Sequence, residues 1–192
     1  MTATAALSPR LQGLPGTGAW QVDPNHSSVG FRLIHHGVST FRCGFKDFEA
    51  RFDAEADVIT GTVKVESVQA FPMLRDRLFE TDFFDLANHP EMRFASTDIV
   101  RSANQVAVEG ELTIKWVTRP VRAEGIVLGT TPVFHYPTKT THEHFGLDAQ
   151  LTIDRREFNL SFNSELPGGL LNLGSHVTIE LALEFVRTEP IS

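Results

Sequence analysis

The sequence is poor in cysteine and in basic residues, and it has no long uninterrupted hydrophobic run. Its single cysteine, Cys43, excludes an intrachain disulfide and is typical of a reducing compartment. The chain holds 17 basic against 24 acidic residues, and no segment concentrates the basic ones. Phosphate binding needs concentrated positive charge, so nucleic acids and anionic membranes are poor candidate partners. No run is long enough to form a transmembrane segment.

Targeting and catalytic motifs are also missing. The first 19 residues contain Arg10 as their only basic residue and lack the continuous apolar core of a signal peptide, so we expect a cytoplasmic protein. No Gly-x-Ser-x-Gly motif, phosphate loop or dinucleotide fingerprint occurs. Cys43 lies in strand phase between two phenylalanines, which favours a buried, inert thiol over a nucleophile. We therefore assign no catalytic residue.

Alternating apolar residues dominate the chain from Ala19 onward, which is typical of half-buried strands. Residues 1–18, rich in glycine and proline, are predicted to be a flexible N-terminal arm, and residues 19–188 a single domain. The phase slips between Phe45 and Phe48, which predicts a bulge or bend. The expected strands lie at 20–22, 29–35, 41–45, 48–52, 59–65, 92–101, 106–115, 119–128, 145–153 and 177–185, with loops at 129–141 and 166–174.

About eight strands result once 41–45 and 48–52 are counted as one bent strand and 20–22 is counted with 29–35. Their connections are too short for helical crossovers. Antiparallel strands of this number can close into a barrel that holds either its own side chains or one small ligand. The segment from Arg75 to Thr97, RDRLFETDFFDLANHPEMRFAST, breaks the pattern. Thr81 or Asp82 is predicted to cap a short helical turn that carries two phenylalanines and ends before Pro90. This segment would form an apolar plug.

Aromatic composition and the histidines leave alternatives open. Fifteen phenylalanines against one tyrosine and two tryptophans suit an apolar lumen, although a filled core would use them equally well.

His142 and His144 share one face of a strand, but no third ligand is fixed by the sequence, so we predict a solvated strand end and no metal site. His35 continues an apolar face and is either a satisfied core residue or a proton carrier near Asp76 or Asp82.

Four motifs in order resemble the YceI-like family of lipocalin-like proteins. They are WQVDPNHSSVGFRLIHHGVSTFRCGF, RDRLFETDFFDLANHPEMRFAST, ELTIKWVTRPV and LTIDRREFNL, and the resemblance covers Ala19 to about Arg187. It implies an eight-stranded antiparallel barrel with a helix near the plug, enclosing a long apolar tunnel. It also implies a non-catalytic carrier or storage protein, often dimeric, for a polyisoprenoid, an isoprenoid quinone or a fatty amide.

Three positions depart from the family pattern: Cys43, Trp116 and Asn159 stand where glycine is usual. If Trp116 kept the inward phase of its strand, it would shorten the tunnel. We therefore predict an all-β barrel that binds one elongated apolar lipid, needs no other cofactor and forms a homodimer. The leucine-rich loop Leu166–Leu173 either forms a lip that makes transient contact with a membrane or meets a partner chain, or it folds back on its own core. The predicted lining is Phe31, Phe45, Phe83, Phe84, Phe94, Leu112, Trp116, Phe145 and Leu147, and the predicted polar groups are His35, Arg75 and Asp76.

Two other functions fit the same barrel. The first is an enzyme that isomerises or cyclises an isoprenoid-like substrate, with His35, Asp76 or Asp82 as acid or base. The second is a barrel filled by its own side chains that acts as an interaction module and has no cavity.

Overall fold

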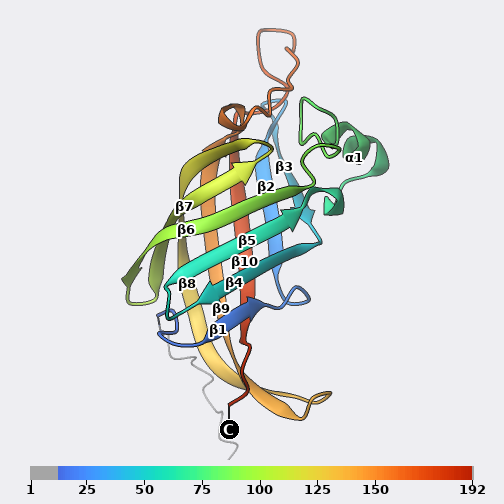
Figure 1. Cartoon of the computed structure of the whole chain (residues 1–192). Coiled ribbons are helices and arrows are strands. Elements are labelled where there is room, and N and C mark those ends of the chain that lie inside the picture. Colours follow the sequence, from blue (N-terminus) through green and yellow to red (C-terminus); the bar gives the residue numbers. More distant parts are fainter. Residues whose placement is uncertain (1–12, 192) are drawn as a thin grey trace, which may run out of the picture.

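The computed structural model describes residues 13–191, and antiparallel strands make up most of them (Figure 1). The strands are β1 (Ala19–Val22), β2 (Ser28–His35), β3 (Ser39–Phe45), β4 (Phe48–Asp53), β5 (Val58–Lys64), β6 (Glu91–Ser102), β7 (Gln105–Ile114), β8 (Val117–His135), β9 (Thr140–Asp154) and β10 (His176–Arg187). Helix α1 spans Pro72–Leu78, and two 3-10 turns, η1 and η2, span Val65–Ser67 and Arg155–Phe158.

Eight of these strands close into a barrel. The ring runs β1-β4-β5-β6-β7-β8-β9-β10 and returns to β1 through the antiparallel pair of Trp20 with Arg187. Strand β2 pairs with the earlier part of β10, and β3 pairs with β2, so this hairpin extends the wall beyond the ring. The predicted eight-stranded antiparallel barrel with one short helix is confirmed.

The phase slip predicted between Phe45 and Phe48 is a bend that separates β3 from β4. Both phenylalanines are buried although they differ in phase by one residue. The two bend residues are held by backbone hydrogen bonds, from Lys46 N to Ser67 O (3.1 Å) and from Lys64 N to Asp47 O (2.9 Å). The wall therefore changes neighbours at this corner, because β3 pairs with β2 whereas β4 pairs with β1 and β5.

The helix begins earlier than the sequence analysis predicted. Pro72 occupies its first turn, where the fixed proline φ angle suits a helix and the missing N–H costs nothing. Phe83 and Phe84 lie in turns after the helix, and Phe84 N donates to Leu78 O at 3.0 Å. The expectation of a helix around the two phenylalanines is corrected accordingly, but both side chains are buried as the plug idea required.

The predicted loop at 129–141 is also corrected, because β8 and β9 continue through it as a two-stranded ribbon. Its tip is confined to residues 136–139. A register shift next to Gly129 starts the ribbon, and Pro132 faces Glu143 within it. The pairing of β8 with β7 stops at Ile126, which faces Gln105, the first residue of β7. The rest of β8 therefore has only β9 as a partner, and proline is tolerated on such an edge. The ribbon projects from the lower end of the barrel (Figure 1).

The core consists of two buried clusters inside the barrel. The first contains a floor of aromatic rings: Phe145 stacks on Phe185 with centroids 4.8 Å apart and meets Trp20 edge-on at 5.0 Å. The second cluster holds Phe83 and Phe84 of the plug segment. Leu14, from the last part of the predicted arm, packs against the first cluster, whereas residues 1–12 lie outside the described part of the chain.

Candidate ligand cavity

An apolar cavity of about 220 Å³ lies inside the barrel and is lined by members of both core clusters. Its walls come from the inward faces of the strands, and the helix end and the segment after it add Leu78, Phe83 and Phe84. The volume is below the roughly 300–1,000 Å³ common for small-molecule pockets. A ligand must therefore be slender, or the lining must move to admit it.

Many of the residues predicted to bind a ligand line this cavity. They are Phe31, Phe45, Phe83, Phe84, Phe94, Leu112 and Leu147. Five of them are buried in the clusters and the other two, Phe31 and Phe94, pack against the clusters, as their apolar spacing indicated. Contact between these side chains and a ligand stays a prediction.

Phe145 and Trp116 do not line the cavity, which corrects the predicted lining. Phe145 belongs to the aromatic floor, where Phe185, Trp20 and Phe52 surround it. Trp116 lies in the turn between β7 and β8 and is 59% exposed. Lys115 before it has a left-handed φ of 57°, so the inward phase of β7 ends there. Trp116 therefore leaves the cavity open.

The three predicted polar groups also lie outside the cavity. Arg75 and Asp76 pair with each other on α1 at 3.2 Å, and both side chains are largely exposed. His35 stacks on His36 near the tip of the β2–β3 hairpin, with ring centroids 3.7 Å apart. The helix begins at Pro72 rather than later, so the charged pair lies on a solvent face of that helix. Neither the pair nor the histidine can contact a ligand inside the barrel in this conformation.

Arg155 is a cavity residue that the sequence analysis missed. It is 3% exposed and lines the cavity at η2. Its Nε donates to Gly174 O at 3.0 Å, and its Nη1 donates to Leu160 O. Burial lowers the pKa of its guanidinium. Two adjacent arginines follow Asp154 in the sequence, and only the turn geometry decides that Arg156 pairs with this aspartate while Arg155 points inward.

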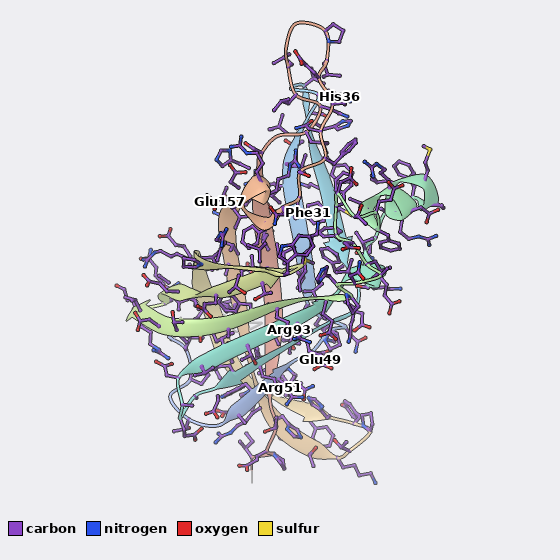
Figure 2. All side chains as sticks on the ribbon, turned by 45° about the horizontal axis from the view of Figure 1, so that its top comes forward. Phe31, His36, Glu49, Arg51, Arg93 and Glu157 are labelled. Atoms are coloured by element: carbon purple, nitrogen blue, oxygen red, sulfur yellow. The ribbon has the colours of Figure 1, made fainter. Side chains whose placement is uncertain are left out.

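The remaining charged residues at the cavity boundary are exposed. Glu49 and Arg93 come from the outer faces of β4 and β6, where Glu49 also lies 4.0 Å from Arg51 (Figure 2). Phe48, Ala50 and Phe52, which alternate with these residues on β4, are buried. Arg155 is therefore the only buried charged side chain of the lining within the described residues.

The loop at 166–174 projects beyond the β2–β3 hairpin at the upper end of the barrel (Figure 1). It is tied to that hairpin by hydrogen bonds from His36 N to Asn172 O (2.7 Å) and from Gly174 N to Ile34 O (2.8 Å). Leu173 turns into the cavity lining, whereas Leu170 and Leu171 are 58% and 50% exposed. The loop therefore contacts the cavity and presents leucines to its surroundings.

Cys43 shows no sign of activation. Its thiol is partly buried and faces the carbonyl oxygen of Gln69, with Sγ and O 3.4 Å apart. Burial raises the pKa of this thiol, which lowers the fraction of reactive thiolate near neutral pH. Apolar neighbours were the reason to predict an inert cysteine, and the raised pKa agrees with that prediction.

Family comparison agrees with this architecture, because residues 20–185 match the YceI-like domain. The chain belongs to the YceI-like family. A similar relative is Protein YceI of Escherichia coli O157:H7, 33% identical over 110 residues that cover 54% of this chain and 58% of that protein. UPF0312 protein ECA1782 of Pectobacterium atrosepticum is 26% identical over 169 residues, which cover 84% of each chain. The family resemblance seen in the sequence motifs is confirmed.

Two solved structures share the fold of this YceI-like chain. BcnA of Burkholderia cenocepacia has a TM-score of 0.66 at 24% identity, covering 85% of this chain and 98% of its own. A polyisoprenoid binding domain from Saccharophagus degradans, implicated in plant cell wall breakdown, has a TM-score of 0.67 at 13% identity and covers 89% and 99%. At these identities the likeness shows the barrel and not the ligand. No helix among the described residues is long and apolar enough to cross a membrane.

Proposed function

We propose that this YceI-like barrel binds one elongated apolar lipid, a polyisoprenoid, isoprenoid quinone or fatty amide, and stores or transports it unchanged. The observation that carries the proposal is the interior cavity, whose buried lining is apolar except for Arg155. The Saccharophagus degradans domain with the same fold is described as polyisoprenoid-binding, which supports this ligand class.

Burial of hydrocarbon supplies enough free energy for such a complex. Each methylene removed from water contributes about 0.8 kcal/mol, so about ten of them match the roughly 8 kcal/mol of a micromolar affinity. A hydrogen bond to a charged group adds about 1.5–3 kcal/mol. The chain of the lipid therefore drives binding, and the single buried charge selects among head groups.

Arg155 is the residue we assign to head-group selection. Two of its nitrogens already donate to backbone carbonyls, which fix the plane of the guanidinium at the cavity wall. A planar donor of this kind suits the carbonyl of a quinone or an amide, or a phosphate. A ligand oxygen placed against it would offset part of the cost of burying this cation.

The enzyme hypothesis gains no support from the cavity. His35 and Asp76 do not line it, and Asp82 forms an ion pair with Arg77 at 2.6 Å instead. The interaction-module hypothesis expected a barrel without a cavity, and a cavity is present. The homodimer implied by the family resemblance and the transient membrane contact predicted for the loop Leu166–Leu173 stay predictions.

A matched pair of substitutions tests the role of the cavity. Ala123 is buried and lines the cavity on β8, whereas Ala107 lies on β7 between the buried, inward-facing Val106 and Val108. Ala123→Phe fills the space, so it should weaken binding of a fluorescent farnesyl or fatty-amide probe by at least about tenfold, equivalent to 1.4 kcal/mol. Ala107→Phe adds the same volume on the opposite face and should bind as the parent does. Equal affinity of both folded variants would refute binding in the cavity.

A further inference from the structure

Three histidines meet where the ribbon of β8 and β9 leaves the barrel. His135 comes from β8, and His142 and His144 come from β9. The Nε2 atoms of His135 and His144 lie 2.8 Å apart, and the ring centroids of His135 and His142 lie 5.0 Å apart. Phe145, the neighbour of His144, packs into the core, so alternation along β9 directs His144 to the outer face. None of the three histidines lines the cavity.

The second nitrogen of two of these rings is held by an acceptor. His144 Nδ1 lies 2.6 Å from Glu184 Oε1, and His142 Nδ1 lies 2.8 Å from the carbonyl oxygen of Arg187. A carboxylate and a carbonyl can only accept, so both Nδ1 atoms carry the proton. In the neutral rings this leaves a lone pair on each Nε2. The histidines that bind metal ions in proteins are usually held in this way, by an acceptor behind the ring.

The Nε2 atoms of His135 and His144 face each other at a distance slightly shorter than that between two nitrogen ligands of one metal ion. In the neutral cluster, His135 Nε2–H donates to His144 Nε2 across 2.8 Å. Two nitrogens bound tetrahedrally to one ion at about 2.0–2.1 Å lie roughly 3.3 Å apart. Moving the two nitrogens about half an ångström further apart, and shifting the His135 proton from Nε2 to Nδ1, would therefore admit a metal ion.

His142 would supply a third nitrogen only after its ring turns toward the other two, because the ligand nitrogens of the three histidines do not all lie within 4.8 Å of one another in this structure. Its Nε2 currently accepts a hydrogen bond from Thr140 Oγ1 at 3.0 Å and would exchange that bond for the ion. His144 is only 6% exposed, so the site is partly shielded from water. Three imidazole ligands suit zinc and its neighbours in the first transition row, and they do not suit calcium or magnesium.

We propose that His135, His142 and His144 bind one divalent ion of the zinc type on the outer wall of the barrel, with Glu184 as a positioning residue. The sequence analysis rejected a metal site because two histidines lacked a third ligand. The structure supplies it, since β8 continues through the predicted loop and brings His135 beside β9.

A neighbouring group must be distinguished from this site. Asp23, His26 and Glu184 place ligand atoms within 4.8 Å of one another, a closer spacing than the three histidines have before any ring moves. The His26 side chain is 67% exposed, and its Nδ1 is already hydrogen-bonded to Asp23 Oδ2 at 2.7 Å. Because both groups contain Glu184, only the histidine variants separate them.

The test is a calorimetric titration of the full-length, tag-free, chelator-treated protein with ZnCl₂, together with the visible absorption spectrum after addition of Co²⁺. We expect one Zn²⁺ per chain and the intense Co²⁺ bands of a four-coordinate site. His135→Ala and His142→Ala, both at half-buried positions, should each weaken Zn²⁺ binding at least tenfold. Glu184→Gln should weaken it by about 10–100-fold, as expected for a partner that orients a ligand.

The controls are His26→Ala and His176→Ala, which should bind Zn²⁺ as the parent does. Thermal unfolding without metal verifies that each variant is folded, because a change at the buried His144 would not separate binding from folding. Absence of Zn²⁺ binding in the parent would overturn the proposal. So would a site that persists in His135→Ala and His142→Ala, or one that disappears in His26→Ala.

Discussion

At the scale of single residues, the polarity of the cavity depends on which of two adjacent arginines points inward. Arg155 points inward to the carbonyls of Gly174 and Leu160, and Arg156 pairs with Asp154, holding the pKa of that carboxyl at about 2. The sequence shows two equivalent cations at this point, and only the η2 turn separates their roles. The predicted polar groups His35, Arg75 and Asp76 lie outside the cavity for the same reason. The sequence shows which side chains are charged or polar, but not whether they point into the barrel.

Arg155→Met tests this residue-scale assignment. The variant keeps an apolar side chain of comparable length but leaves two carbonyl oxygens without their donor, which should reduce the free energy of unfolding by about 1–3 kcal/mol. It should also reduce the preference for lipids with carbonyl or phosphate heads over plain hydrocarbons of equal length. Urea unfolding and competition binding measure the two effects.

Arg156→Met is the matched control, because it removes an exposed arginine one position along the chain. It should leave both the head-group preference and the lipid affinity unchanged. If Arg155→Met folds and still prefers polar heads as strongly as the parent, head-group selection by Arg155 is excluded.

At the scale of elements, alternation predicted the strands well, because one face of each is buried against the cavity or the core. This alternation failed to predict two segments. The helix that starts at Pro72 was missed although proline fits the first turn of a helix, and Pro132 lies on a strand edge within the predicted loop 129–141. Because residues 129–141 were predicted to be a loop, the sequence analysis missed the long β8–β9 ribbon and the histidine cluster on it.

The loop at 166–174 is the element we expect to govern lipid uptake. Leu170 and Leu171 are exposed on it, whereas Leu173 reaches the cavity. Replacing both exposed leucines with serine should slow transfer of lipid from vesicles several-fold, because the apolar contact with the donor bilayer is lost. The equilibrium affinity should change little. Stopped-flow transfer of a fluorescent lipid from neutral phosphatidylcholine vesicles measures the rate.

A control for this loop replaces two equally exposed apolar residues on the barrel wall. Val100 and Ile126 are 49% and 41% exposed, so Val100→Ser with Ile126→Ser removes similar surface far along the chain from the loop. Transfer should then proceed at the parent rate. Equal slowing in both double variants, or in neither, would count against a specific role of the leucine loop.

At the scale of the whole molecule, the closed barrel was predictable and the size of its cavity was not. Closure follows from eight antiparallel strands with short connections. The cavity volume instead depends on how far the aromatic floor around Phe145 extends and on where Trp116 points, and both were misplaced from sequence. Phenylalanine composition alone left a lumen and a filled core equally open, because the same side chains serve both.

The central claim is that the purified barrel contains, or accepts, one elongated apolar lipid. Native mass spectrometry of the full chain, followed by organic extraction and identification of the released compound, tests it most directly. We expect one long-chain lipid per chain, either retained from the cell or taken up from added quinones, polyprenols or fatty amides. A protein that is reproducibly empty and rejects all three classes would contradict the account.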